Sequence, residues 1–216
     1  MVGVFLAIFA PRREVLDAGS SRWDKGVVPE RESVTLVPEV LEGDGLRLVP
    51  LDLEVSDDMA ALGDDPDALR FTYISAPFGR EEARAWIQRY LDGWQEGSRA
   101  GFSVQTPEGG FLGMMSIIHL HLDEREGELG YIIAPHARGK GVATRALSLL
   151  TAWAFESLGL ERAELRIASG NAGSVAVAER CGYSLEGTMR SLYFKNGIRG
   201  DTLIYSRLPT DPPPTP

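Results

Sequence analysis

Apolar residues recur at intervals of three and four over two long segments, and this spacing predicts two amphipathic helices. The first spans residues 80–96, where acidic residues in the first turn favour a helix start. The second begins after residue 141 and runs to about Leu158, just before a helix-ending glycine. A shorter helix is predicted over residues 172–181. We expect the aromatic stripe of the first helix to belong to the core; it comprises Trp86, Tyr90 and Trp94.

Alternating or continuous apolar runs predict the strands, and glycine-containing turns join several of them. Pro107–Gly110 and Asn196-Gly197 are typical of hairpin turns. Pro50 marks the first strand as an edge strand, and Ser56 indicates the start of a further helix. The predicted strands are residues 46–51, 101–106, 111–121, 128–133, 162–168, 183–194 and 201–208.

This order of elements predicts an α+β fold, with helices on both faces of a mixed, mostly antiparallel central sheet. The strands and helices do not alternate regularly, as they would in a doubly wound fold. We expect one domain over residues 45–208. Residues 1–44 are broken up by proline and glycine and read as a partly irregular extension, and residues 209–216 read as a disordered, proline-rich tail.

The formal net charge of −9 argues against non-specific binding of nucleic acid. An acidic surface aids solubility, and it would also tolerate or steer a cationic amine. The single cysteine, Cys181, excludes a disulfide framework within the chain and a cysteine zinc site. The longest apolar run, residues 2–10, is too short to cross a bilayer and lacks the basic lead-in of a signal peptide. We therefore expect a cytoplasmic protein without a membrane partner.

A glycine-rich basic turn lies between a strand and the second long helix. The apolar run that ends at Ala134 is followed by Arg138-Gly139-Lys140-Gly141. Glycines let the backbone approach a ligand, and a helix N-terminus presents free amides to it, so this turn predicts a site for a phosphorylated ligand. A nucleotide P-loop would need a hydroxyl where Val142 stands, and the glycine spacing fits the dinucleotide fingerprint poorly.

The turn resembles the pyrophosphate loop of the GNAT family of acyl-CoA-dependent N-acyltransferases, Arg/Gln-x-x-Gly-x-Gly/Ala. A second block strengthens the resemblance: Asn171-Ala-Gly-Ser174, then a basic residue, Arg180, before Cys-Gly-Tyr. The resemblance covers about residues 45–208. Within the family the chain is most similar to the branch with the bacterial Rim-type protein N-terminal acetyltransferases.

The resemblance implies how acetyl-CoA would be held, without a metal. Backbone amides of the turn and the helix start would bind the pyrophosphate, and edge groups of the preceding strand would pair with the pantetheine arm. Asn171 would hydrogen-bond that arm. Arg180 would contact coenzyme phosphates, unless it is only a solvated surface arginine. The turn residues are Arg138, Gly139, Lys140, Gly141, Val142, Ala143 and Thr144; the strand residues are Ile132, Ile133 and Ala134.

Catalysis requires a base for the amine and a hydrogen-bond donor for the departing thiolate. Many family members carry a tyrosine where this chain has Ala178, so the resemblance points to Ser174 as the thiolate partner; the alternative is a helix-capping serine. Glu128 is the first candidate base, or else a surface carboxylate. His119 and His121, two apart on one strand face, could act as a base through water. Tyr193 stands where Rim-type relatives carry a candidate base glutamate.

The sequence therefore predicts an acetyl-CoA-dependent N-acetyltransferase that acts by direct attack in a ternary complex. The acceptor would be a protein or peptide N-terminus or a small-molecule amine. Two alternatives stay open: a non-catalytic acyl-CoA sensor or scaffold, and an enzyme for another acyl-CoA such as succinyl-CoA. The N-terminal extension and the C-terminal hairpin are candidate contact surfaces of a homodimer.

Overall fold

A computed structural model describes residues 36–214 of the chain. Its centre is one eight-stranded sheet with the order β1-β2-β3-β4-β5-β6-β8-β7. All neighbours are antiparallel except β5 and β6, which run parallel. The strands are β1 (Leu41–Gly43), β2 (Leu46–Pro50), β3 (Ala100–Gln105), β4 (Phe111–His121), β5 (Glu126–Ile133), β6 (Arg162–Ala168), β7 (Ser184–Lys195) and β8 (Ile198–Arg207). The predicted mixed, mostly antiparallel sheet is confirmed.

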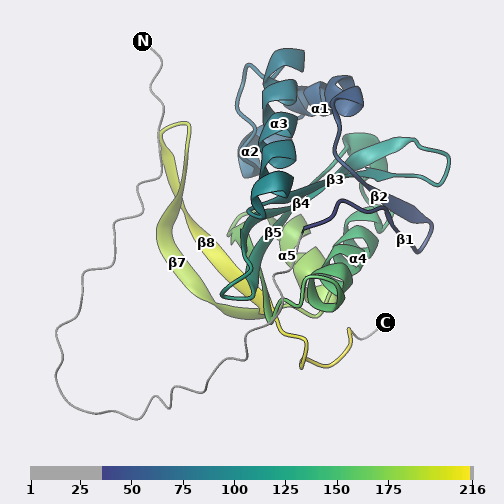
Figure 1. Ribbon diagram of the computed structural model, residues 1–216. Coiled ribbons are helices and arrows are strands. Elements are labelled where there is room, and N and C mark those ends of the chain that lie inside the picture. Colours follow the sequence, from purple (N-terminus) through teal and green to yellow (C-terminus); the bar gives the residue numbers. More distant parts are fainter. Residues whose placement is uncertain (1–35, 215–216) are drawn as a thin grey trace, which may run out of the picture. The chain divides into compact units, whose positions relative to one another are not determined.

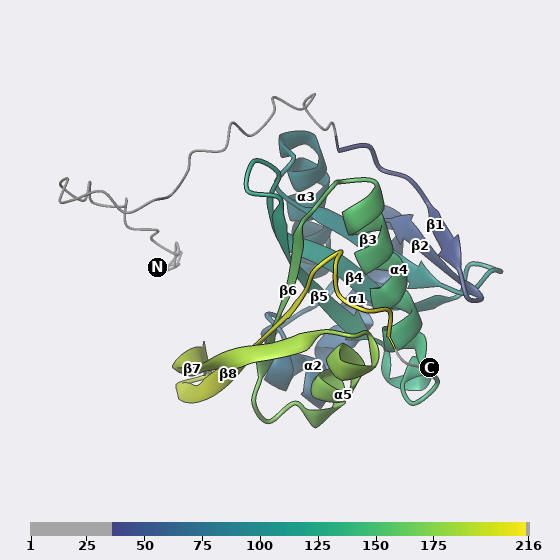
Figure 2. The same ribbon diagram turned by 90° about the horizontal axis from the view of Figure 1, so that it is seen from below.

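Helices cover both faces of this sheet, as Figures 1 and 2 show. The helices α1 to α3 pack on one face, and α4 and α5 pack on the other. The helices are α1 (Ser56–Ala61), α2 (Pro66–Phe71), α3 (Arg80–Glu96), α4 (Val142–Glu156) and α5 (Ala172–Arg180), and short 3₁₀ turns are η1 (Leu53–Val55), η2 (Leu62–Asp64) and η3 (Pro135–Ala137). No helix within residues 36–214 is long and apolar enough to cross a membrane.

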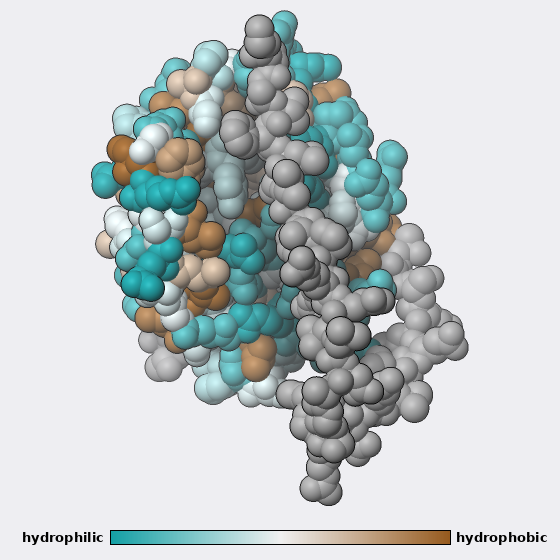
Figure 3. Space-filling view, turned by 90° about the vertical axis from the view of Figure 1, so that its left-hand side faces the viewer, coloured by the Kyte–Doolittle hydropathy of each residue, from teal (hydrophilic) through white to brown (hydrophobic). Residues whose placement is uncertain are grey.

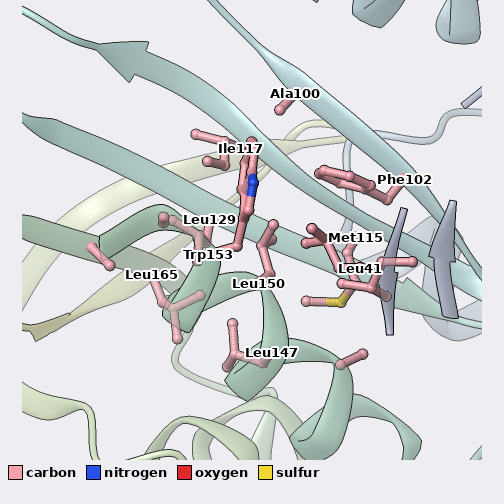
Figure 4. Close-up of a cluster of buried hydrophobic side chains, with 14 of the residues drawn as sticks. Leu41, Ala100, Phe102, Met115, Ile117, Leu129, Leu147, Leu150, Trp153 and Leu165 are labelled. Carbon is pink, nitrogen blue, oxygen red and sulfur yellow. The ribbon is translucent and has the colours of Figure 1, made fainter. Parts of the chain in front are cut away.

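The larger part of the core lies between the sheet and α4 (Figure 4). Leu147 and Leu150 of α4 are fully buried against Met115 and Leu129 of the sheet. Three aromatic rings close one end of this core, with edge-to-face contacts and centroids 5.4–6.0 Å apart. These rings belong to Trp94, Phe102 and Trp153.

The sheet begins before Gly45, where the sequence pattern placed the domain boundary. Leu41–Gly43 pairs with β2, so β1, and not the strand that contains Pro50, is the edge. Pro50 is tolerated because it is the last residue of its strand. Leu36 is buried, and Glu39 accepts a hydrogen bond of 2.6 Å from the Trp153 indole. The extension predicted for residues 1–44 otherwise lies outside the described residues as far as residue 35.

The sequence pattern also missed α2, which is short. Pro66 stands at its first turn, and the Asp65 carboxylate caps it by accepting from the Ala68 amide at 3.0 Å. At the other end of the chain, residues 209–214 form neither helix nor strand. Asp211 closes a turn there by accepting from the Leu208 amide at 2.9 Å.

Candidate active site

The two parallel strands of the sheet separate part-way along their length. Pairing of β5 with β6 stops at Leu129 opposite Leu165, although β5 continues to Ile133 and β6 to Ala168. Beyond that point β5 pairs only with β4, and β6 only with β8. The sheet therefore has an open edge in its interior, where an extended ligand can pair with β5.

A cavity of about 470 Å³ occupies this opening. It is lined from both faces of the sheet: Tyr90 of α3 and Met114 come from one face, and Tyr131 and Ser174 come from the face covered by α4 and α5. The cavity thus passes through the sheet, and a ligand that enters from one face can meet a second ligand from the other.

Hydrogen bonding decides which groups of β5 face the opening. The Ala134 amide donates to the Leu112 carbonyl at 2.9 Å, and its carbonyl accepts from Ala137. Because antiparallel neighbours exchange bonds at every second residue, Ile132 also directs its backbone groups to β4. Ile132 and Ala134 are therefore wrong as pairing residues. Tyr131 and Ile133 present their backbone groups to the opening, and the Ile133 carbonyl also accepts from Arg138 Nε at 3.0 Å.

The glycine turn is shaped for close approach of a ligand. Gly139 and Gly141 both have φ of +71°, which only glycine adopts without strain, and a Cβ built on either would meet no atom within 4 Å. Gly141 precedes α4, so the amides of Val142, Ala143 and Thr144 have no acceptor inside the helix. Within residues 36–214 none of the amides from 139 to 144 donates to another group. These open amides fit a pyrophosphate.

Arg138 does not offer its charge to this turn. Its amide donates to the Pro135 carbonyl at 3.3 Å, and its guanidinium pairs with the Asp65 carboxylate and contacts Asp67 at 3.2 Å. Burial would raise the pKa of Asp65, but the hydrogen bond and charge of Arg138 and the Ala68 amide hold it below its ordinary value. Arg138 thus ties the turn to α2, which corrects its predicted role as a phosphate ligand.

Asn171 and Ser174 lie at the start of α5, beside the opening. The Asn171 side chain caps the helix by accepting from the Ser174 amide at 3.1 Å. The alternative interpretation of Ser174 as the capping residue is therefore wrong, and its hydroxyl is not used in the cap. Both residues line the cavity. The Asn171 side-chain oxygen is thus engaged as an acceptor. The side-chain nitrogen is left to donate a hydrogen bond to a ligand.

Tyr131 is a site residue that the sequence analysis missed. Its hydroxyl donates to the Ser174 carbonyl at 3.4 Å and lines the same cavity. Burial raises the pKa of Tyr131 to about 12, so the hydroxyl stays protonated at neutral pH. The signal was a tyrosine within an apolar run, residues 129–134, whose other residues are aliphatic or glycine. Two hydroxyls therefore lie where the sequence predicted one.

Glu128 lies inside the cavity and is only 7% exposed. Burial raises the pKa of its carboxyl above the ordinary value, and Arg166, whose Nε lies 3.4 Å from Oε2, opposes this effect. The same Arg166 Nε is closer to Glu164, at 2.8 Å. The alternative interpretation of Glu128 as a surface carboxylate is therefore wrong, and the buried carboxyl has an environment that suits the predicted general base.

The remaining candidates lie outside the cavity. His119 stands opposite Glu128 and His121 opposite Glu126 in the β4–β5 register, but both side chains are exposed and neither lines the cavity. Partial desolvation and the nearby positive charge of Arg99 lower the pKa of His119 below its ordinary value. Arg180 and Lys140 are exposed as well. Cys181 is buried, and burial raises the pKa of its thiol, so it is not poised as a nucleophile.

The β7–β8 hairpin closes one side of the cavity, and we name its contact with the α2 segment the bridge. The Tyr193 hydroxyl donates to the Arg70 carbonyl, and Lys195 Nζ donates to the carbonyls of Thr72 and Ile74. Figure 3 shows the side of the molecule that carries this hairpin, where brown apolar patches interrupt the polar surface. Tyr193 stands where Rim-type relatives carry a candidate base glutamate. In this protein it helps to fix the hairpin that forms a wall of the cavity.

The glycine turn with free amides before a helix is the arrangement that the resemblance implies for the pyrophosphate, and the structure places it next to two separating parallel strands. A family model described as "Acetyltransferase (GNAT) domain" matches residues 45–184. The chain belongs to the GNAT acetyltransferase family. It is 38% identical over 123 residues to YdaF of Bacillus subtilis (strain 168), whose name assigns it provisionally to the ribosomal N-acetyltransferases. That match covers 57% of this GNAT chain and 64% of YdaF.

Solved structures share the fold. RimL, a ribosomal L7/L12 α-N-protein acetyltransferase in complex with coenzyme A, superposes with a TM-score of 0.70 at 22% identity, covering 79% of this chain and 98% of RimL. Spermidine N-acetyltransferase of Vibrio cholerae, in complex with CoA and spermine, gives a TM-score of 0.70 at 22% identity, covering 78% and 98%. At this identity these likenesses establish the fold of this GNAT protein and leave its acceptor open.

Proposed function

We propose that the protein transfers an acetyl group from acetyl-CoA to a primary amine by direct attack in a ternary complex. The observation that carries this proposal is the cavity through the sheet, with Glu128 on one wall and Ser174 and Tyr131 on the other. Acetyl-CoA, the acyl donor, would lie along the open edge of β5, and the backbone amides from Gly139 to Thr144 would bind its pyrophosphate. Asn171 would donate a hydrogen bond from its side-chain nitrogen to the pantetheine arm.

Each wall performs one part of the chemistry. The amine arrives protonated at neutral pH, and the Glu128 carboxylate accepts that proton, directly or through water. The amine nitrogen then bonds to the acyl carbon and loses a second proton, which passes to the departing sulfur or to water, as the carbon–sulfur bond breaks with its electron pair on sulfur. Ser174 donates a hydrogen bond to this thiolate, and Tyr131 donates a second one by turning its hydroxyl away from the Ser174 carbonyl. No covalent acyl-enzyme is needed, because both reactants meet inside one cavity.

The lining of the cavity favours a protein or peptide N-terminus as acceptor. The walls are mostly apolar and aromatic, and the Glu128 carboxylate is partly balanced by Arg166. Lys195 adds a further positive charge in the wall. A polyamine carries several positive charges and would need more carboxylates than this cavity offers. A single amine on a peptide, with apolar neighbours, suits these walls.

A thiol-release assay tests the proposal. Acetyl-CoA is offered with a panel of peptides that have free N-termini, the same peptides with blocked N-termini, and polyamines. We expect turnover with the free N-termini alone. Binding of coenzyme A by calorimetry without turnover on any amine would favour the sensor alternative, and turnover with succinyl-CoA but not acetyl-CoA would correct the donor.

A further inference from the structure

A second cavity, of about 500 Å³, lies against the bridge between the hairpin and α2. Its walls come from α2, from the loop after β6 and from the residues around the β7–β8 turn. It shares four lining residues with the first cavity: Phe71, Ala168, Tyr193 and Lys195. The two cavities therefore meet at the bridge.

The lining of this second cavity is basic, although the chain as a whole has a net charge of −9. Arg70, Lys195 and Arg199 line it, and Asp201 is the one acidic residue among its lining residues. Asp201 is already engaged, because its Oδ1 accepts from the Ser191 amide at 2.8 Å. Within residues 36–214 neither Arg70 nor Arg199 forms an ion pair.

Both arginines are held on aromatic rings. The guanidinium carbon of Arg70 lies 4.7 Å from the Phe71 ring centre, and that of Arg199 lies 5.0 Å from the Phe194 ring centre. Arg199 also donates to the Ser191 carbonyl at 2.9 Å. Stacking restrains a guanidinium and leaves donors at its edge for a planar carboxylate. The arrangement is suited to an anionic group.

We propose that this basic cavity is a subsite for a carboxylate side chain of the acceptor, which makes the protein selective for amines on acidic peptide segments. The inference rests on the proposed function, because the amine must occupy the first cavity. Tyr193 and Lys195 of the bridge line both cavities, so the cavities are adjacent and one extended acceptor chain that passes over the bridge can reach both. Since such a chain advances about 3.3–3.6 Å per residue, the carboxylate belongs to one of the residues that closely follow the N-terminus.

The test uses two peptides that differ only in aspartate or asparagine at the second to fourth positions. For the wild type we expect the acidic peptide to have a kcat/KM about 10-fold higher, through KM and not kcat, as for one charge-assisted contact. Arg199→Glu should abolish or invert this preference, and Arg70→Gln should reduce it without altering the hairpin. Arg190→Glu is the matched control, because Arg190 is exposed on β7 but lines neither cavity.

A binding arm separates this inference from the proposed function. N-terminally blocked acidic peptide cannot react, yet it should bind the wild type by fluorescence anisotropy and lose affinity about 10-fold in Arg199→Glu. That result supports the subsite even if no amine is acetylated. Equal kcat/KM and equal binding for the two peptides would overturn it. Displacement of the blocked acidic peptide by inorganic phosphate at similar concentration would also overturn it, since a general anion site would then explain the cavity.

Discussion

Glu128 of β5 and Glu164 of β6 stand directly opposite each other in the parallel register, and their carboxyl groups have opposite pKa shifts. Burial raises the pKa of Glu128. Burial would also raise that of Glu164, but hydrogen bonds from Arg166 and Arg162 lower it below its ordinary value. The two neighbouring carboxyls thus differ in how readily they take up a proton, which agrees with the proposed role of Glu128 as the base.

Replacement of Glu128, the proposed base, should remove one limb of the pH profile of the rate. For Glu128→Gln we expect kcat to fall roughly 10²- to 10⁴-fold. In the wild type the rate should rise with pH through a pKa above 4.5, the ordinary value, because the base works deprotonated. The variant should lack that rise while coenzyme affinity is unchanged. Full activity with the same pH limb would assign the base elsewhere, His119 being the first candidate.

The neighbouring carboxylate should tune that pKa. Glu164→Gln leaves Arg166 without its closer partner and removes a negative charge beside Glu128. Both changes favour ionised Glu128, so the acidic limb of the profile should move to lower pH. Steady-state rates across the acidic range measure this shift. If the acidic limb does not move, the charges of Glu164 and Arg166 do not affect the pKa of Glu128.

A charged side chain in the glycine turn should block the donor. For Gly141→Glu we expect coenzyme binding to be lost, because a carboxylate would stand among the open amides. Gly109→Glu is the matched control: Gly109 also has positive φ, +94°, and also has open space around its Cβ, but it lies in the β3–β4 turn. Calorimetry with coenzyme A should therefore show normal affinity for the control alone. Equal affinities in both variants would place the pyrophosphate elsewhere.

The two hydroxyls should share the stabilisation of the thiolate. Ser174→Ala should lower kcat by about 10-fold or more with little change in coenzyme affinity, and Tyr131→Phe should have a smaller effect of the same kind. The double variant should lose less than the product of the two effects, because both groups act on one sulfur. Wild-type turnover in both single variants would show that Ser174 and Tyr131 serve only in packing and do not stabilise the thiolate.

Asp65 should matter for stability through both its cap and its charge. Asp65→Ala should destabilise the fold by about 2 kcal/mol, whereas Asp65→Asn, which still caps α2, should lose less. Because the pKa of Asp65 is lowered, its charge contributes stability above the ordinary pKa of 3.8, and this is lost as the pH falls through the folded-state pKa. Denaturant titration of both variants at neutral and acidic pH checks this. Equal stability of wild type and Asp65→Ala would contradict the assigned ion pair.

Regular periodicity carried most of the fold prediction. The helix over residues 80–96 and the strands over residues 111–121 and 162–168 have their predicted bounds, because each is a long segment rich in apolar residues. The short elements β1 and α2 have too few residues for a period to emerge. Their places depend on long-range contacts: β1 on pairing with β2, and α2 on the tie to Arg138.

The site was predictable where local motifs define it. The glycine turn and Ser174 follow from sequence spacing, but the position of Arg138 depends on Asp65, far away in the chain. The Glu128–Arg166–Glu164 cluster forms only when β5 and β6 align, and the polar residues of β6 resemble a solvated face in the sequence. The predicted homodimer concerns a second chain, and the predicted cytoplasmic location concerns the cell. Both stay predictions.

The separation of β5 from β6 leaves backbone groups of β5 without a neighbouring strand in the middle of the sheet. A pantetheine arm bound there would act as a missing strand, so the donor would be at once a reactant and a piece of the architecture. Its arrival would then tighten the whole central layer, and the departure of free coenzyme would loosen it again with every turnover.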